Sequence, residues 1–404
     1  MTFIPGETPV PASGATWGQA EKDAMCAQIQ SGWLTAGRKN KEFQITLAQK
    51  WQKEYAITCN SGSSANLLAV SALVEAGFWK PGDEIITVAT SFPTTINPLI
   101  QHGLVPVFTD VDIGTYNATH HAIGDALSKK TKGIMLAHTM GHPFPLAIAE
   151  MAQALKLPLI EDCCDAFGAG WSDGSLVGSR GALATCSFFP AHHIMCGEGG
   201  VVFTDDHDLK KIVDSVGSWG RDCWCDPGEE NCCGKRFDWS WPNMPHGFDH
   251  KYTFSTLGYN LKMTDVQAVC GLEQLKKVHT FIEMRNENWL YLRASMEDLA
   301  DHIILPTRQS WANPSWFGFV MTIREPGQRT ALQEYLASKK VGSRLLFGGN
   351  ITRQPYMKNK TFRISGSLEN SDKVMDDTLW IGCWPGLTTE MLDYTVDLLE
   401  GFFE

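Results

Sequence analysis

Residues 187–200, SFFPAHHIMCGEGG, decide the fold of this chain. This stretch joins two short apolar runs, residues 182–188 and 200–203, so we expect two strands around a glycine-rich turn. Upstream, nearly all-apolar runs alternate with stretches of helical character. These runs are residues 84–88, 105–108, 133–136 and 157–160. Apolar strands separated by helices predict an α/β fold with a mostly parallel sheet that is covered on both faces.

The length predicts two domains. A chain of 404 residues exceeds the size at which one hydrophobic core keeps growing. Residues 15–55 are predicted to be helical with a break at Ser31-Gly32, and residues 264–300 and 389–403 are further helical stretches. We expect a large domain at 1–285 and a small α/β domain at 286–404. Residues 221–250 are rich in Cys, Trp, Gly and Pro without a period, which predicts a long, functional loop.

Composition excludes several classes of partner. The formal net charge of −11 argues against nucleic acids and acidic membranes. The N-terminal residues lack the basic and apolar regions of a secretory signal, and no apolar run is long enough to span a bilayer. We therefore expect a cytoplasmic protein. In that compartment its twelve cysteines indicate buried thiols or a metal centre rather than disulfides.

Three other motifs have the character of a ligand site. Gly62 and Ser63 lie in NSGSSAN, a turn that opens an apolar helix and can bind an anion through backbone N–H groups, although a simple helix cap is the alternative. Phe92 follows a strand and can stack on a flat ligand, or it can be a core residue. Asp162 closes a strand, where a carboxylate can pair with a ligand cation or cap a helix.

Together these motifs resemble the sugar aminotransferase family typified by DegT, DnrJ, EryC1 and StrS. The family pattern is roughly S-F-x-x-x-K-x-(I/L)-x-x-G-(E/D)-G-G, and the resemblance extends from Ser31-Gly32 to about Gly271. It implies a fold-type-I (aspartate aminotransferase-like) vitamin B6 enzyme. The resemblance further implies that Phe92 stacks on the cofactor ring and that Asp162 pairs with its pyridinium nitrogen. The phosphate would be held by residues that the family pattern matches: Gly62, Ser63, Ser187 and, across a homodimer interface, Asn260.

His192 is a departure from this pattern, because it occupies the position of the lysine to which pyridoxal phosphate is attached. An imidazole cannot replace that covalent bond, but it can move a proton near neutral pH. We therefore expect noncovalent pyridoxamine phosphate (PMP), with His192 as the catalytic base. His193 is the runner-up for this role, and a catalytically inactive aminotransferase relative is the alternative reading.

Four cysteines suggest a metal centre. Cys164, Cys223, Cys225 and Cys233 are spaced as C-x58-C-x-C-x7-C, and four thiolates suit a [2Fe–2S] cluster. Zinc is the rival metal. Cys232, next to Cys233, is the alternative fourth ligand.

The histidine and the cysteines together resemble one branch of the family, the PMP-dependent iron–sulfur 3-dehydrases of CDP-4-keto-6-deoxy-D-glucose. This resemblance implies a role in making 3,6-dideoxyhexoses of lipopolysaccharide O-antigen, with electrons from an NAD(P)H-dependent flavin or iron–sulfur reductase. Candidates for binding the nucleotide pyrophosphate are Arg344, Asn350 and Arg353, with solvated surface arginines as the alternative. A 3-dehydrase of a dTDP-linked sugar and a noncatalytic relative with structural zinc are the alternative functions.

Overall fold

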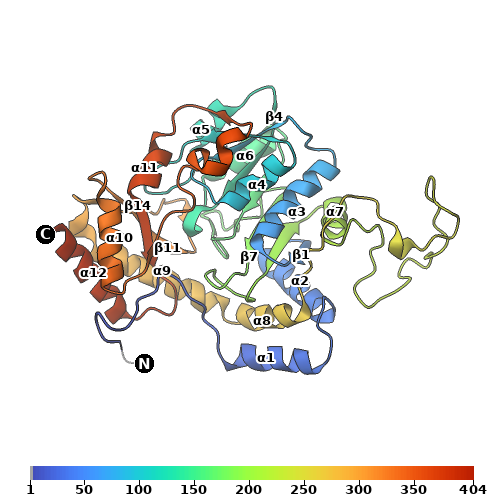
Figure 1. The fold of residues 1–404 in the computed structure, drawn as a ribbon, viewed down its shortest axis with the longest axis horizontal. Coiled ribbons are helices and arrows are strands. Elements are labelled where there is room, and N and C mark those ends of the chain that lie inside the picture. Colours follow the sequence, from blue (N-terminus) through green and yellow to red (C-terminus); the bar gives the residue numbers. More distant parts are fainter. Residues whose placement is uncertain (1–2) are drawn as a thin grey trace.

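A computed structural model describes residues 3–404 (Figure 1). The α-helices are α1 Gln19–Gln30, α2 Arg38–Trp51, α3 Gly62–Glu75, α4 Pro93–Gln101, α5 His120–Ala126, α6 Leu146–Ala154, α7 His207–Gly217, α8 Asp265–Leu275, α9 Val278–Ser295, α10 Gln328–Ser338, α11 Glu369–Asp377 and α12 Thr389–Phe403. The strands are β1 Tyr55–Cys59, β2 Glu84–Val88, β3 Val105–Thr109, β4 Thr131–Ala137, β5 Leu159–Asp162, β6 Gly170–Trp171, β7 Leu183–Ser187, β8 Gly200–Thr204, β9 Ile303–Ile304, β10 Ala312–Asn313, β11 Gly318–Ile323, β12 Ser343–Arg344, β13 Arg363–Ile364 and β14 Thr378–Gly382. Short 3-10 helices are Thr139–Gly141, His250–Tyr252, Glu297–Leu299, Ile351–Arg353 and Pro355–Asn359.

An eight-stranded sheet forms the centre of the molecule, in the order β1-β8-β7-β5-β4-β2-β3-β13. The pairings from β7 through β5, β4, β2 and β3 to β13 are all parallel, whereas β8 is antiparallel to both of its neighbours. The predicted α/β class with a mostly parallel sheet is confirmed. Because the parallel strands run in one direction, their carboxyl ends lie along one edge, where open sheets of this kind bind ligands.

Helices cover both faces of this sheet, which explains why its strands are nearly all apolar. One face packs against α3, α4 and α7, and α3 contacts both β7 and β8. The other face packs against α2, α5, α6 and α8 through a second core, whose large side chains include Phe43, Leu47 and Trp51. Figure 1 shows the sheet enclosed between these two helical layers.

A second sheet, β12-β14-β11-β9, is antiparallel and lies in the C-terminal part of the chain, packed against α9, α10 and α12. The predicted domain boundary near 285 falls inside α9. Several contacts cross it: Val10 forms a β-bridge with Val341, β10 pairs with β6, and β13 joins the edge of the large sheet beside β3. The division at 285 stays a prediction.

The structure differs from the sequence prediction in three places. The helical stretch 264–300 is two long helices, because α8 ends before Lys276 and α9 begins at Val278. The predicted helical region 15–55 ends at Trp51, and the unpredicted strand β1 follows it. Strand β5 begins at Leu159, two residues after the start of the predicted run, and ends at Asp162, where the sequence placed this carboxylate.

Residues 221–250, the Cys-rich loop, contain almost no regular structure, as predicted. In Figure 1 this loop projects from the body of the molecule beside α7. Across the described residues, no helix combines the length and apolar composition needed to cross a membrane.

Candidate cofactor site

A cavity of about 970 Å3 opens at the carboxyl ends of the parallel strands. Side chains of both sheets line it: Asp162 comes from the end of β5, Ser187 from the end of β7, and Arg344 and Trp380 from the smaller sheet. The complete lining is Ser13, Asn60, Ser61, Gly62, Ser63, Ser64, Asn66, Phe92, Thr94, Thr95, Ala137, His138, Met140, Asp162, Cys164, Asp165, Ser187, Phe189, Ala191, His192, Glu198, Gln267, Phe317, Arg344, Leu345, Phe347 and Trp380. The predicted residues Gly62, Ser63, Phe92, Asp162, Cys164, Ser187, His192 and Arg344 thus share one cavity.

The amino end of α3 lines one wall of the cavity. Ser61 caps this helix by accepting a hydrogen bond from the N–H of Ser64, and Gly62 and Ser63 form its first turn. A Cβ atom on Gly62 would lie 2.5 Å from Cβ of Ser187, so only glycine allows α3 to approach the end of β7 this closely. Free N–H groups, serine hydroxyls and the positive end of the helix together suit a phosphate.

Asp162 is buried at the end of β5 and held by three donors. Its Oδ2 accepts hydrogen bonds from Asn66 Nδ2 and Thr95 Oγ1, each at 2.8 Å, and its Oδ1 accepts one from the N–H of Cys164 at 3.1 Å. Asn66 is oriented in turn by Thr185, whose hydroxyl donates to the amide oxygen at 2.6 Å. This network fixes a carboxylate at the cavity wall, where it can pair with the pyridinium nitrogen of a vitamin B6 cofactor.

Phe92 lies at the cavity rim, where half of its side chain is exposed. Its ring meets Phe347 edge-on, with 6.3 Å between the ring centres. The core alternative weighed for Phe92 is therefore wrong, and its position fits a stacking residue.

His192 faces the cavity from the turn between β7 and β8. Its Nε2 lies 3.4 Å from Oδ1 of Asp165, and its ring lies 5.3 Å from the ring of Phe317, centre to centre. Nδ1 is buried and has no hydrogen-bond partner among the described residues. No lysine occurs among the residues that line the cavity. On the large-sheet side of the cavity, His192 is therefore the only basic residue of the described chain that has both a carboxylate neighbour and a ring nitrogen without a partner.

His193 points away from the cavity. It is buried, and its Nε2 lies 2.9 Å from the backbone carbonyl of Ser315, to which it donates. Burial, followed by the positive charge of Arg285, holds the pKa of His193 well below its ordinary value. A neutral imidazole bonded to a backbone carbonyl outside the cavity does not fit the role of a catalytic base.

Sequence reasoning missed Asp165, Thr95 and Phe317. Asp165 comes three residues after Asp162 in EDCCD, and the turn after β5 returns it to the cavity beside His192. An acidic residue so close to a predicted cofactor ligand was a signal that could have identified it. Phe317 had no such signal, because it comes from the C-terminal half of the chain.

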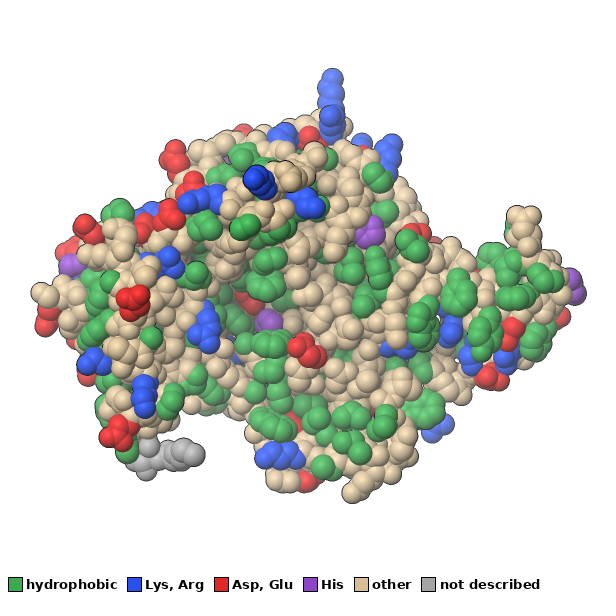
Figure 2. Space-filling model, in the orientation of Figure 1, with side chains coloured by type: hydrophobic (Ala, Val, Ile, Leu, Met, Phe, Trp, Pro, Cys, Tyr) green, Lys and Arg blue, Asp and Glu red, His purple; other side chains and the backbone are tan. Residues whose placement is uncertain are grey.

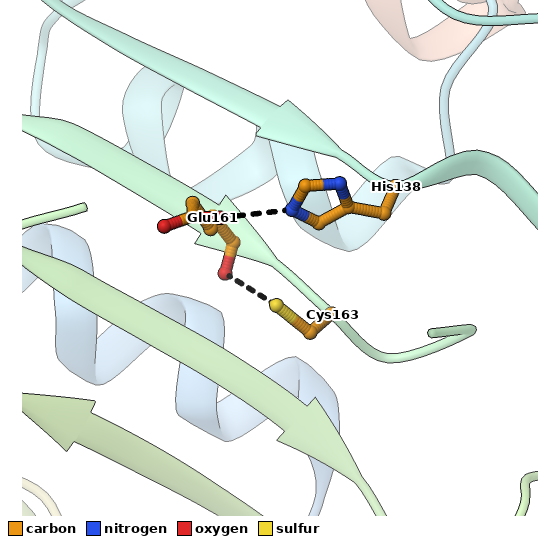
Figure 3. Close-up of side chains that lie close together, drawn as sticks. All are labelled: His138, Glu161 and Cys163. Atoms are coloured by element: carbon orange, nitrogen blue, oxygen red, sulfur yellow. Dashed lines mark hydrogen bonds and ion pairs between the residues drawn. The ribbon is translucent and has the colours of Figure 1, made fainter. Parts of the chain in front are cut away.

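His138, Glu161 and Cys163 lie close together at the ends of β4 and β5 (Figure 3). The N–H of Phe144 donates to His138 Nδ1 at 3.2 Å, so the proton of this ring is on Nε2, which donates to Glu161 at 3.0 Å. Glu161 also accepts hydrogen bonds from three backbone N–H groups, those of Gly178, Arg180 and Gly181. With its acceptor positions occupied, this buried cluster is a structural support for the strand ends rather than a metal site.

Two of the predicted pyrophosphate ligands lie outside the cavity. Asn350 is buried; its oxygen accepts from the N–H of Thr352, and its amide donates to Asp372. Arg353 forms ion pairs with Asp372 at 3.0 Å and with Asp376 at 3.5 Å. Local carboxylates and a helix cap use these side chains in this structure, and their role at the pyrophosphate stays a prediction. Arg344 lines the cavity, and its guanidinium bonds only the carbonyl of Ser343 in the described structure.

Asn260 does not line the cavity of its own chain. Its side-chain oxygen accepts a hydrogen bond from Lys262 Nζ at 2.6 Å, and Lys262 lies 3.3 Å above the ring of Trp219. Burial, followed by the charge of Arg221, lowers the pKa of Lys262 to about 8. A role for Asn260 at the phosphate would require a second copy of the chain and stays a prediction.

The four predicted metal ligands occupy two places. Cys164 lies in the cavity wall, whereas Cys223, Cys225 and Cys233 lie in the Cys-rich loop. In the part of the chain that the structure describes, only His138, Glu161 and Cys163 form a group of three possible metal ligands whose atoms lie within 4.8 Å of one another. The four predicted cysteine thiols therefore do not converge on one point in this structure.

Two loop thiols nevertheless have the chemistry of metal ligands. Burial raises the pKa of Cys225, but hydrogen bonds from Cys232 and Cys223 bring it below its ordinary value overall. Cys233 shows the same balance, because hydrogen bonds from the backbone N–H of Lys235 and from the side chains of Trp239 and His250 outweigh burial and lower its pKa. A lowered pKa favours the thiolate, which is the form that binds metals.

Comparison with known proteins agrees with this geometry. The model of the DegT/DnrJ/EryC1/StrS aminotransferase family matches residues 16–400. Lipopolysaccharide biosynthesis protein RfbH of Salmonella typhimurium is 49% identical over 99% of this chain and 93% of its own length. The dTDP-4-dehydro-2,6-dideoxy-D-glucose 3-dehydratase of Saccharopolyspora spinosa is 47% identical over 99% of this chain and 88% of its own.

Among solved structures, E. coli GDP-4-keto-6-deoxy-D-mannose-3-dehydratase with bound hydrated PLP superposes with a TM-score of 0.87. It is 28% identical in sequence, and the match covers 96% of this chain and 99% of that one. The sequence motifs, the cavity and the family model lead to the same conclusion: the chain belongs to the DegT/DnrJ/EryC1/StrS aminotransferase family and has the fold of its vitamin B6-dependent enzymes.

Proposed function

We propose that this protein is a PMP-dependent 3-dehydrase of a nucleotide-linked 4-keto-6-deoxyhexose. The observation that carries the proposal is a cofactor cavity lined by His192 and, among the described residues, by no lysine. An aminotransferase needs a lysine that attaches the cofactor and shuttles its proton. An enzyme that removes the C3 hydroxyl needs only a base beside a noncovalent cofactor.

The cavity fits the cofactor on three counts. The amino end of α3 and Ser187 suit the phosphate, Phe92 lies where a ring can stack, and the orientation of Asp162 is fixed by its three donors. When bound, PMP supplies an amine that condenses with the C4 ketone of the sugar and a ring that accepts electrons as the C3 hydroxyl leaves. Asp162 would pair with the ring nitrogen of the bound cofactor and stabilise its positive charge.

His192 moves the proton in this scheme. Asp165 lies beside Nε2 of His192, where its carboxylate orients the imidazole. In this scheme His192 would remove the proton from C4′ of a bound cofactor. The carboxylate of Asp165 stabilises the positive imidazole that results, and this imidazole can then donate its proton to the departing C3 hydroxyl.

We propose CDP-4-keto-6-deoxy-D-glucose as the substrate, in 3,6-dideoxyhexose biosynthesis. Support comes from the likeness to the lipopolysaccharide biosynthesis protein, and a dTDP-linked sugar is the second candidate because the 47% identical relative is named for one. Arg344 and Trp380 line the cavity, and we expect them to contact the nucleotide. The test is turnover of CDP-, dTDP- and GDP-linked 4-keto sugars with added PMP. If the enzyme used only the dTDP-linked sugar, CDP-4-keto-6-deoxy-D-glucose would be excluded as the substrate. If none of the three nucleotide sugars were dehydrated, the protein would not be a dehydrase of these sugars.

We also propose that Cys164, Cys223, Cys225 and Cys233 bind a [2Fe–2S] cluster that receives electrons from an NAD(P)H-dependent reductase. Cys232 is the alternative to Cys233. Because the loop thiols do not converge on Cys164 in this structure, this ligand set would require the Cys-rich loop to move, and no step above depends on it. Iron and acid-labile sulfide analysis with EPR of the anaerobically purified protein tests this proposal. Zinc in place of iron would exclude electron transfer by this site.

We further propose that the protein is a homodimer. Figure 2 shows hydrophobic side chains gathered over α1 and α8 and on the Cys-rich loop. Ile29 of α1 and Trp224 and Phe237 of the loop are among the exposed apolar residues of these regions, and an exposed apolar surface of this kind favours association. A second copy would bring its Asn260 toward the phosphate. Light scattering tests the dimer, and a monomer that binds PMP tightly would contradict it. The cytoplasmic location also stays a prediction.

A further inference from the structure

Arg285 is a buried arginine in the middle of α9, with 1% of its surface exposed. Its guanidinium donates three hydrogen bonds, all to backbone carbonyls. One nitrogen bonds the carbonyl of Phe317 at 3.1 Å, and the other bonds the carbonyls of Ala191 at 3.1 Å and His192 at 3.2 Å. Among the described residues it forms no ion pair with a carboxylate, and its Nε has no partner.

The three carbonyls belong to the two segments that place His192. Ala191 and His192 lie in the turn between β7 and β8, outside the ladders of the sheet. Phe317 directly precedes β11, and its ring packs against the imidazole of His192. The N–H of Phe317 donates to the carbonyl of Met140 at 2.9 Å, and its carbonyl is held by Arg285. Arg285 therefore fixes the backbone that carries the base and the aromatic ring against which the base packs.

A simple structural role does not account for a charged group here. Burial lowers the pKa of Arg285, which reflects the cost of placing a charge away from water. A neutral donor could satisfy one carbonyl at lower cost. The planar guanidinium of arginine can donate to two segments that are far apart in sequence at the same time. A lysine cannot donate to both in the same geometry.

We propose that Arg285 is a positioning residue for His192, acting through the backbone of the 191–192 turn and through Phe317. This inference rests on the proposed function of His192 as the base. A base misplaced by about 1 Å loses up to about 100-fold in rate, whereas binding of the cofactor phosphate at α3 does not depend on this turn.

The experiment compares Arg285→Met, Arg285→Lys and the control Leu292→Ala in the full-length protein with PMP. Leu292 is fully buried two turns further along α9 and contacts the C-terminal core, so its loss lowers stability without touching His192. Three quantities are measured: the PMP dissociation constant, kcat and KM for C3 dehydration, and amide hydrogen exchange of residues 189–193.

We expect kcat of Arg285→Met to fall by about 10- to 100-fold while KM and PMP affinity change by less than about 3-fold. Arg285→Lys should recover part of kcat. Amide exchange at 189–193 should accelerate in Arg285→Met and not in Leu292→Ala. Any of three results would overturn the proposal. The kcat of Arg285→Met could equal that of the wild type, Leu292→Ala could show the same changes in kcat and KM, or amide exchange at 189–193 could be unchanged in Arg285→Met. If the wild type dehydrates no nucleotide sugar, the proposed function fails, while the exchange comparison still decides the role of Arg285.

Discussion

The carboxylate of Asp165 lies 3.4 Å from Nε2 of His192, and each group is otherwise poorly satisfied: Asp165 Oδ2 and His192 Nδ1 are both buried without a partner among the described residues. The two side chains reach this position from different strand ends, β5 and β7. A carboxylate beside one ring nitrogen orients the imidazole and stabilises the ring when it is protonated.

Asp165→Asn removes this charge while it keeps the shape of the side chain. We expect kcat for C3 dehydration to fall by about 100-fold, because the amide no longer stabilises the protonated ring or enforces one tautomer. PMP affinity should stay within a few-fold of wild type, measured by absorbance titration. An Asp165→Asn enzyme with normal kcat would show that the carboxylate plays no part in proton transfer.

Borohydride reduction after incubation with pyridoxal phosphate should leave no pyridoxyl group at position 192. The positive control is His192→Lys, in which the restored amine should yield a labelled peptide covering residues 187–200. Mass spectrometry of the digested protein reads out both results. A label on a nearby lysine of the wild type, such as Lys235 or Lys262, would contradict noncovalent binding.

His192→Asn should bind PMP and lose about 10²–10⁴-fold in the rate of C3 dehydration, the usual contribution of a general base. His193→Asn is the matched control, because that ring points away from the cavity and bonds the Ser315 carbonyl. Single-turnover measurement with the accepted nucleotide sugar separates the two variants. The assignment of the base would have to change if His193→Asn were the slower enzyme.

Much of the fold was predictable, because each central strand is a short, nearly all-apolar run. The strand at residues 84–88 was predicted to the residue. The two-residue gap at Lys276-Lys277 between α8 and α9 was not, since no proline or glycine marks it in the sequence. At the site, Asp162 was readable from a strand end, whereas Phe317 was not, because only the approach of the two sheets brings it to His192.

Two of the three predicted pyrophosphate residues have a local partner that could not be predicted. Asn350 and Arg353 were proposed because arginines pair well with phosphate, but Asp372 on α11 is close enough to bond both of them. The sequence gives no sign of this pairing, since the partner is distant in the chain. Arg344 escapes such a partner and remains in the cavity.

Cys225→Ser should remove iron from the purified protein and abolish net 3-deoxygenation with a reductase, if the proposed cluster forms. Cys270→Ser is the control, because that thiol is buried on α8 with its sulfur toward the carbonyl of Met195. Dehydration itself should survive in part in Cys225→Ser. It is measured by the exchange of solvent oxygen-18 into the C3 hydroxyl. Equal loss of dehydration and reduction with intact PMP binding would make the metal structural.

Glu21 should stabilise the fold in a pH-dependent way. Burial raises its pKa, but Lys277, the N–H of Gly18 and Gln274 outweigh burial and lower it from 4.5 to about 2. Because the folded-state pKa is depressed, the contribution is fully present above about pH 4.5 and is lost as the pH falls toward 2. With allowance for the solvent around Lys277, it amounts to about 1–2 kcal/mol.

The measurement is thermal denaturation of Glu21→Gln and wild type between pH 3 and 8. The difference in melting temperature should be constant above about pH 5 and shrink below about pH 4.5. A difference that does not change with pH would show that the Glu21 charge contributes nothing and that the variant loses only packing.

The Cys-rich loop leaves and re-enters the molecule at almost the same point. Arg221 forms a β-bridge with Phe254, and the N–H of Asp222 donates to the carbonyl of Thr253 at 2.9 Å. Because its ends are already joined, the excursion imposes little strain on the sheet, and lengthening it twofold costs only about 0.6 kcal/mol of chain entropy. The excursion is therefore modular. Residues 222–253 could be exchanged for a tight turn, or they could be grafted onto a relative that lacks them. The chemistry that they carry can be gained or lost in evolution while the cofactor-binding fold stays intact.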